Sequence, residues 1–581
     1  MKLVKYQKRG NKIGIITPYI TQIEQYVVFA YLLCMLGIFP LYYKEQYYGI
    51  GNAKYEFFWN TSLSFIGITL IFTLRKLILE RILQSRSNKT IATYKNQAKE
   101  EIIFLKVLDN LSFLDYAVFI YGICVVLSYA FSDFKDFAFR GAAGWEMGLC
   151  SQMIFVITYF ILSRQNIFKG IFYSKQKIYA TYNQSKQRKF ASIILAIHLI
   201  SSALTFLFGI LHRFEIDPLG MYVGLDLYQK IEFLSTIGQA TWFSGYVCTV
   251  FAVGVILFYV SEKHWLRIMT GIYSVLSFGI LVTQNSDSAF IAIAGIMLLM
   301  GYFSLSDMKK WCRFCQVSSL MWGTFAGIGI LQKVFVNRAI PLDTLSNFFS
   351  QSIFTWLMLL ISVGIIIFYA KLGRKKDAQI EKVMRITKAV YQAISVLVVI
   401  FFVALIFFIY LNTKGYLLQW FNYQNTHPYL LFDYHWGSNR GSTWMISWQT
   451  FMQLPFYQKL FGVGPDSLSA YLYSVPEISD LLHSLWGNVR LTNAHNEYLN
   501  SLICYGVVGV SAWLAVLIGG ITYFYKKAKD NPFLIAFAFC IMGYACHNIF
   551  CYQQVCATPF LFIALGIGES LTKSENFNTI K

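Results

Sequence analysis

Long runs of apolar residues alternate with short polar segments along most of this chain. A helix needs about 20 predominantly apolar residues to cross the hydrocarbon core of a bilayer, and the runs approach or exceed that length. The pattern therefore predicts an all-α fold, a polytopic transmembrane helix bundle with about fourteen spans. The predicted spans cover residues 23–43, 57–79, 113–131, 147–163, 190–211, 242–260, 266–282, 289–305, 317–331, 353–370, 390–411, 499–525, 533–551 and 555–571.

One polar segment, Asn412–Ala494, is far longer than the other connections on its side of the predicted membrane. We expect it to form a large, partly helical exterior loop, the only soluble piece with enough residues to shape a site. The chain then divides into an N-terminal bundle of about eleven spans (residues 1–411), the loop (412–494) and about three C-terminal spans (495–581). A shorter exterior loop is predicted over His212–Thr241.

The charged residues are few but strongly biased toward Lys and Arg. Only 13% of the chain is charged, yet the formal net charge is +20. Lys and Arg concentrate in alternate connections, including Arg75–Asn110, Arg164–Lys189 and Leu372–Lys388. Short basic connections stay in the cytoplasm, so the bias predicts a cytoplasmic N-terminus and an exterior Asn412–Ala494. It also accounts for the positive charge without a nucleic-acid partner.

The predicted spans contain almost no Asp, Glu, Lys or Arg away from their ends. Ion-coupled transporters place such residues at membrane mid-depth to bind the coupling ion, despite the cost of burying charge. The pattern therefore disfavours a secondary transporter and indicates that polar chemistry is confined to the exterior face.

Few residue patterns suit a metal ion. Cys312 and Cys315 have zinc-like spacing, but a structural zinc site needs four ligands and no second pair lies nearby. Glu215 and Asp217, in the shorter loop, form an acidic pair that could hold a divalent cation. A solvated charged loop at a helix end is the favoured interpretation of that pair, and we expect no cofactor.

His495 lies where the large loop runs into the predicted span that begins at Leu499, at the depth of the lipid headgroups. Histidine titrates near neutrality and can accept a proton from an attacking hydroxyl. Taken alone, an interfacial histidine with no catalytic role is the simpler interpretation.

Arg440 precedes a segment in which Trp444, Trp448 and Phe451 recur at helical spacing. A helix N-terminus favours anions, and Arg binds phosphate oxygens through two parallel hydrogen bonds. Arg213, in the shorter loop, is a second candidate phosphate contact. Without further information, an aromatic amphipathic helix with a solvated Arg440 is an equally good interpretation.

Three segments around the large loop share a recognisable order. They are Asn439–Trp444, the glycine-rich Phe461–Leu468, and His495-Asn496 followed by Gly506 and Gly509. This arrangement resembles the signature of the bacterial O-antigen ligase and O-antigen polymerase family. The chain departs from the family pattern in three places: Trp444 stands where a leucine is usual, Ser235–Trp242 lacks an asparagine that the family often has there, and Asn285–Ser288 lacks an arginine that many members carry.

The resemblance implies a glycosyltransferase of envelope polysaccharide assembly in the bacterial inner (plasma) membrane. Such an enzyme would move a glycan from a polyprenyl-pyrophosphate carrier to the hydroxyl of a glycan or lipid acceptor, among membrane lipids and without a cofactor. His495 would be the general base, and Arg440, with Arg213, would neutralise the pyrophosphate. The other candidate substrate-binding residues are Asn496, Arg490 and Trp444.

Several functions remain open on the sequence. A ligase moves a finished glycan once, whereas a polymerase adds repeat units, and no motif separates the two. The runner-up class is a polysaccharide or lipid-linked glycan flippase or transporter, which would need charged residues along a central cavity. A non-catalytic scaffold would tolerate the replacement of His495.

The charge bias generates a prediction about topology. A cysteine introduced into Asn412–Ala494 should react with a membrane-impermeant thiol reagent in intact cells, once the eleven native cysteines are replaced. A cysteine placed in Arg75–Asn110 is the matched control and should react only after lysis. Labelling of the large loop only after lysis would contradict the predicted orientation.

Overall fold

The computed structural model describes residues 22–90, 111–165, 182–373 and 377–573. Within these ranges most of the chain is helical, and its strands are the two-residue pair β1 (Phe233–Leu234) and β2 (Gly238–Gln239). Ten described helical stretches are long and apolar enough to span a membrane. The prediction of an all-α, multi-pass membrane protein is thereby confirmed.

The ten long stretches correspond to ten of the predicted spans. They are residues Gln22–Leu41 (ending in η1, Cys34–Ile38, and η2, Phe39–Leu41), α2 (Ile50–Thr90), α4 (Phe113–Ala130), α7 (Tyr182–His212), α9 with α10 (Ala240–Val250 and Ala252–Val260), α11 (His264–Thr283), α13 (Met308–Val334), α15 (Ile353–Leu372), α16 (Asp377–Thr413) and α22 (Glu497–Lys527).

Shorter helices lie at the remaining predicted spans. They are α6 (Leu149–Ser163), α12 (Ser288–Ser304), α23 (Ile535–His547, preceded by η3, Pro532–Leu534) and α24 (Thr558–Lys573). Because these helices are shorter than a full bilayer crossing requires, the number of about fourteen spans stays a prediction.

Two helices continue well past the predicted membrane boundaries. α2 runs on to Thr90, and α16 begins at Asp377 rather than near Val390. Hydropathy locates only the apolar part of a helix, whereas the backbone hydrogen bonds can continue into charged sequence outside the bilayer. Residues 91–110 of the predicted basic connection lie outside the described residues.

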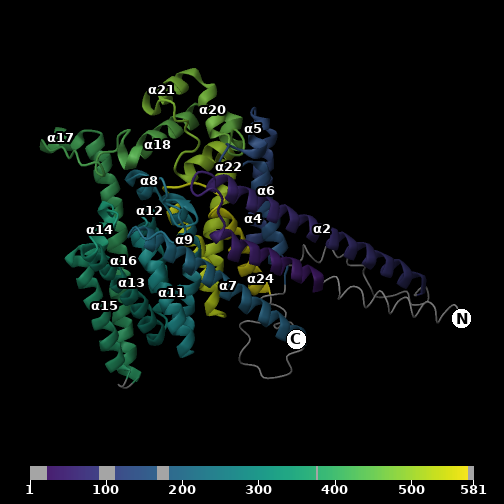
Figure 1. The fold of residues 1–581 in the computed structure, drawn as a ribbon, viewed down its shortest axis with the longest axis horizontal. Coiled ribbons are helices and arrows are strands. Elements are labelled where there is room, and N and C mark those ends of the chain that lie inside the picture. The colour runs from purple at the N-terminus through teal and green to yellow at the C-terminus, as the bar shows by residue number, and fades with distance from the viewer. Residues whose placement is uncertain (1–21, 91–110, 166–181, 374–376, 574–581) are drawn as a thin grey trace.

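The large loop carries most of the remaining helices. They are α17 (Tyr416–Phe421), α18 (Trp436–Gln453), α19 (Phe456–Phe461), α20 (Leu468–Ser474) and α21 (Pro476–Trp486). Figure 1 shows α17, α18, α20 and α21 together at one end of the molecule. α18, α19 and α20 all contact α22, so the loop rests on the helix that follows it. The other short helices are α5 (Lys135–Arg140), α8 (Leu227–Glu232) and α14 (Thr344–Gln351).

α22 is central to the bundle. It packs against α4 and α23, while α24 packs against α6 and α12 against α23. In contrast, α15 and α16 lie at the periphery and expose apolar side chains such as Leu360, Leu397 and Phe401 (Figure 1). A continuous apolar surface of this kind is typical of helices covered by lipid.

A break in α22 anchors the large loop to the bundle. At Gly506 the backbone leaves the helical conformation, with φ 69° and ψ −175°. Beside the break, the carbonyls of Ile503 and Cys504 accept hydrogen bonds from the backbone N–H groups of Val463 (3.0 Å) and Gly464 (3.2 Å). A carbonyl left without a donor in an apolar environment is costly, so the glycine-rich segment stabilises the broken helix.

Glycine is required on both sides of this contact. A Cβ on Gly506 would lie 2.2 Å from the carbonyl oxygen of Leu460, and one on Gly462 would lie 2.1 Å from that of Cys504. Both glycines also have positive φ values, which residues with a side chain rarely adopt. Two of the sequence segments that resemble the O-antigen family therefore interlock backbone to backbone.

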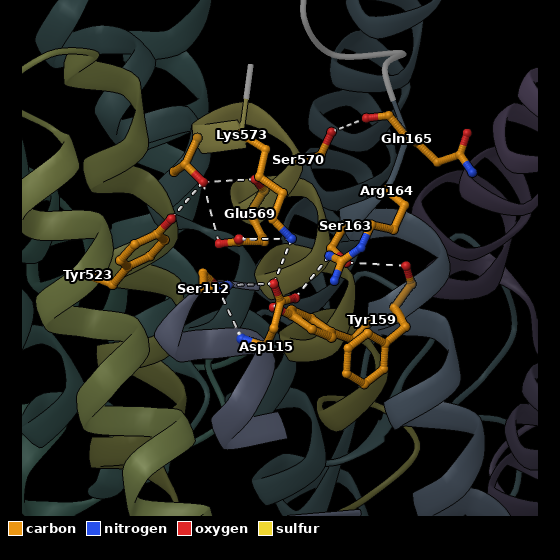
Figure 2. Close-up of polar contacts among 12 residues, drawn as sticks. Ser112, Asp115, Tyr159, Ser163, Arg164, Gln165, Tyr523, Glu569, Ser570 and Lys573 are labelled. Carbon is orange, nitrogen blue, oxygen red and sulfur yellow. Dashed lines mark hydrogen bonds and ion pairs between the residues drawn. The ribbon is translucent and has the colours of Figure 1, made fainter. Parts of the chain in front are cut away.

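An ionic cluster joins the helices at the opposite end of α4 (Figure 2). Asp115, in the first turn of α4, is 1% exposed and accepts hydrogen bonds from Arg164 (2.9 Å), Lys573 (2.7 Å) and Tyr159 (2.9 Å). Tyr159 lies in α6, Arg164 follows α6 directly, and Lys573 ends α24. One buried carboxylate thus holds three helices together. It lies at the end of α4 away from the loop, and α4 is about 27 Å long.

Asp115→Ala should lower the free energy of unfolding by about 3 kcal/mol, because it leaves Arg164 and Lys573 together without their shared anion. Both cations keep partial solvent contact, which places the effect at the lower end for a broken buried ion pair. The measurement is thermal unfolding of the protein in detergent.

Glu381→Ala is the matched control for this prediction. Glu381 forms an exposed ion pair with Arg385 on α16, so its loss should leave the unfolding midpoint almost unchanged. An Asp115→Ala variant that melts with the wild type would contradict the role of the cluster.

Candidate functional site

A left-handed turn sets the position of Arg440 at the start of α18. Gly437, Ser438 and Asn439 have φ values of 58°, 59° and 66°, so the regular helix begins only at Arg440. Glycine and asparagine tolerate this conformation better than other residues do. The Arg440 Nη1 group donates to the carbonyl of Gly437 at 3.0 Å, which folds the side chain back over the turn.

Gly441 allows the chain to pass close to this turn. A Cβ at Gly441 would lie 1.8 Å from the carbonyl oxygen of Asp433, and the next residue, Ser442, donates its backbone N–H to Tyr434 at 3.0 Å. The Ser442 hydroxyl donates to the carbonyl of Asn439 at 2.7 Å instead of capping the helix. The helix start is thus held by hydrogen bonds to the backbone carbonyls of the turn.

The first turn of α18 is attached directly to the backbone around His495. The Thr443 hydroxyl donates to the carbonyl of Ala494 at 3.0 Å, and the Trp444 indole N–H donates to the carbonyl of His495 at 3.4 Å. His495 itself has a φ of 47° and donates its backbone N–H to the Asn493 side chain at 3.0 Å. These contacts bring the Arg440 turn and the His495 turn side by side.

Aromatic residues from the α23–α24 connection complete this part of the site. The Arg440 guanidinium lies 5.9 Å from the centre of the Phe550 ring, and Trp444 stacks on the same ring at 5.5 Å. Tyr552 meets the His495 imidazole edge to face at 5.3 Å. Neither Phe550 nor Tyr552 was singled out from the sequence, because an aromatic residue in an apolar run carries no signal of its own.

Two tryptophans extend the aromatic surface beyond Tyr552. The Trp242 indole N–H donates to the Tyr552 hydroxyl at 3.2 Å, and Trp145 packs edge to face against both rings at 5.2 and 4.9 Å. Trp145 lies in the connection between α5 and α6. This connection is held by Asp466, whose carboxylate accepts the backbone N–H groups of Ala142 (2.8 Å) and Met147 (3.1 Å).

The charges of the site are set by burial. Loss of water on burial, together with the positive charge of Arg440, lowers the pKa of His495 to about 4. The imidazole is therefore neutral at physiological pH, the form that can accept a proton. Arg440 is half-buried, and its buried Nε atom has no hydrogen-bond partner among the described residues. A buried, unpaired guanidinium N–H is costly, which favours an anionic ligand at this position.

Asp287 faces the same region from the start of α12. Its Oδ2 accepts the Tyr429 hydroxyl at 3.3 Å, whereas its buried Oδ1 has no partner among the described residues. Burial and the neighbouring Asp343 raise the pKa of Asp287, and the positive charge of Arg440 opposes that rise. The segment in which the sequence lacks the family's arginine thus supplies a carboxylate near Arg440.

Asn496 and Arg490 have separate positions in the structure. The Asn496 side chain accepts the backbone N–H of Leu499 at 2.9 Å and caps the start of α22. Arg490 is exposed, donates to the Ser469 hydroxyl at 2.9 Å and lies over the Tyr473 ring at 4.9 Å. Asn496 therefore supports the His495 turn, while Arg490 belongs to the α20 side of the loop.

Arg213 has a different environment from the one that the sequence suggested. It is 0% exposed, and its guanidinium donates to four backbone carbonyls, those of Thr283, Lys230, Ile231 and Gln284. These bonds join the shorter loop to the end of α11. With its donors directed at the backbone, Arg213 is a structural residue, and the expectation of a second phosphate contact there is corrected.

Glu215 and Asp217 are each engaged by their own partners. Glu215 pairs with Lys230 at 2.8 Å. Asp217 accepts backbone N–H groups from Met221 (3.0 Å) and Tyr222 (2.7 Å). Within the described residues no group of three or more His, Cys, Asp or Glu side chains is arranged to hold a metal ion.

A comparison with known families agrees with this geometry. The family model described as O-antigen ligase matches residues 339–514 of the chain. The matched range contains Arg440, the glycine-rich segment, His495 and Gly506, and it ends before Phe550 and Tyr552. A search of curated proteins finds no significant match. The predicted resemblance to O-antigen ligases and polymerases is confirmed, and it supports a role of that type in polysaccharide assembly.

Proposed function

We propose that this protein transfers a glycan from a polyprenyl-pyrophosphate carrier to an acceptor hydroxyl at the exterior face of the bacterial inner membrane. The observation that carries the proposal is the attachment of the first turn of α18 to the carbonyls of Ala494 and His495. The Arg440 and His495 turns are therefore adjacent. Arg440 has an Nε–H group without a hydrogen-bond partner among the described residues, and His495 is neutral, so the two could supply the cation and the base that such a transfer uses.

The two side chains have complementary tasks in the proposed reaction. His495 removes the proton from the acceptor hydroxyl as its oxygen attacks the anomeric carbon of the donor sugar. The bond between that carbon and the phosphate oxygen breaks, and its electron pair stays on the pyrophosphate. Arg440 donates hydrogen bonds to the developing negative charge, so no metal is needed at that oxygen. The imidazolium then releases its proton to water.

The aromatic surface suits a carbohydrate substrate. Sugar rings present apolar C–H faces, and the aromatic surface that Trp145 and Trp242 form with Tyr552 begins at His495, which Tyr552 contacts. Trp444, stacked on Phe550, occupies the Arg440 side of the same surface. We assign the Tyr552 side to sugar and the Arg440 side to pyrophosphate.

The central experiment supplies the purified protein with lipid-linked repeat units. Transfer that depends on His495 supports the proposal, and the products separate its two forms. A ladder of lengths indicates a polymerase, whereas one discrete conjugate with a different acceptor indicates a ligase. Movement of the lipid-linked glycan across the membrane without any transfer would contradict the proposal and favour a flippase.

His495→Ala should reduce transfer by about 10²–10⁴-fold, the usual contribution of a general base. In cells, the lipid-linked donor should accumulate on the exterior side, because its synthesis and translocation precede this step. The amount and sidedness of lipid-linked glycan are the measurement. His483→Ala is the matched control, since His483 is exposed on α21, where its side chain contacts the Gly487 carbonyl and the Tyr473 ring. Donor retained inside the cell would refute the catalytic role.

Arg440→Lys should lose most of the activity, and Arg440→Ala nearly all of it. Lysine keeps the charge but presents a point donor in place of the planar fork that grips two phosphate oxygens. Rates of transfer at saturating acceptor give the comparison, with Arg338→Lys as control because Arg338 is exposed between α13 and α14. Full activity of Arg440→Lys would show that the site requires only charge.

A further inference from the structure

Glu497, two residues after His495, has a carboxylate that is buried at the outer end of α22. It is 1% exposed, and its Oε1 accepts hydrogen bonds from Gln553 (3.1 Å) and Tyr544 (3.2 Å). Its Oε2 accepts the side-chain amide of Asn548. A buried carboxylate is tolerated only when such donors replace its water. Any arrangement that removes one of these hydrogen bonds is therefore costly, and the cluster is held in one geometry.

Two of the three partners, Asn548 and Gln553, lie at the two ends of one short segment, residues 548–553. The backbone N–H of Glu497 also donates to the carbonyl of Asn548 at 3.0 Å, so backbone and side chain hold the same end. Gln553 is fixed from its other side, because its Oε1 accepts the Gln152 amide of α6 at 2.6 Å. The segment is therefore tied to α22 and to α6 at once.

Residues 548–553 carry the rings that contact both proposed reacting groups. Phe550 lies under the Arg440 guanidinium, and Tyr552 lies against the His495 imidazole. Tyr552 also covers part of the half-buried His495 imidazole. A shift of this segment would therefore move the two groups together and would let water reach the imidazole.

We propose that Glu497 is a positioning residue, which sets the geometry of His495 and Arg440 by holding residues 548–553 against them. This inference rests on the proposed glycosyl transfer. Glu497 does not touch the reacting atoms; it acts through Phe550 and Tyr552. The charged and titratable groups that face His495 are Arg440 from α18 and Tyr552 from the connection.

The three donors around the carboxylate provide a sharp test. In Glu497→Gln, the remaining side-chain oxygen can accept from Gln553 and Tyr544, as Oε1 does in the wild type. The new amide N–H₂ group then faces the N–H₂ group of Asn548, so two donors meet. Changing Asn548 to Asp in the same protein restores an acceptor there and keeps the oxygen that His547 contacts. The double variant Glu497→Gln/Asn548→Asp thus exchanges the carboxylate and the amide across one hydrogen bond.

Glu497→Gln should slow transfer by up to about 100-fold, the cost of misplacing reacting groups by about 1 Å. The pH below which kcat/KM falls (the acid limb of the pH profile) should rise from about 4 toward about 6.5. The reason is that His495 regains an ordinary pKa when water reaches it. The double variant should recover most of the rate and the original acid limb. Glu569→Gln is the matched control: Glu569 is a buried glutamate near Lys573 at the opposite end, so its loss should affect stability but not the pH profile.

Two results would overturn the inference. One is a Glu497→Gln protein with the rate and pH profile of the wild type. The other is a loss of activity that follows only the amount of folded protein, with an unshifted acid limb and no recovery in the double variant. A wild type that transfers no glycan would instead refute the proposed function. The titration of His495, followed by NMR with labelled histidine, then still tests Glu497, and an unchanged His495 pKa in Glu497→Gln would overturn its role.

Discussion

Backbone hydrogen bonding in an apolar environment is the constraint on which the arrangement of this protein depends. A helix that breaks inside a membrane domain must find new partners for its carbonyl groups, and α22 finds them in Val463 and Gly464. The contact is possible only because Gly462 and Gly506 have no side chains. It fixes the large loop to the bundle, and Asp466 then fixes the α5–α6 connection to the loop.

The candidate site gains its chemistry from this scaffold. Arg440 and His495 are 55 positions apart in the numbering, yet their turns are joined by the hydrogen bonds of Thr443 and Trp444 to residues 494 and 495. The same burial that holds them lowers the pKa of His495 and leaves a guanidinium N–H without a partner. An isolated histidine at a membrane surface would keep an ordinary pKa, because water would solvate its charged form.

The two ends of the bundle use charge differently. Around Asp115, the cations Arg164 and Lys573 pair with the buried carboxylate and join α4, α6 and α24 (Figure 2). At the loop end, Arg440 and Asp287 each retain a buried polar atom without a partner among the described residues. Unsatisfied buried groups are uncommon in native structures, and a ligand is a frequent explanation for them. The unpaired atoms of Arg440 and Asp287 therefore support a ligand site at the loop end.

The sequence by itself determined the class of the protein and the order of its motifs. Apolar runs of membrane length predicted the long helices, and Arg440, Gly462, His495 and Gly506 could be picked out because these residue types in this order resemble a known family. Only the tertiary structure decided which side chains share the site. Arg213 and Arg440 were both candidate phosphate contacts in the sequence, but the Arg213 guanidinium donates to backbone carbonyls. The sequence did not indicate that Glu497, Phe550 and Tyr552 belong near the site. The physical reason is that their roles depend on contacts between α18, α22 and the α23–α24 connection. Local periodicity predicts helices but not which distant helices pack together.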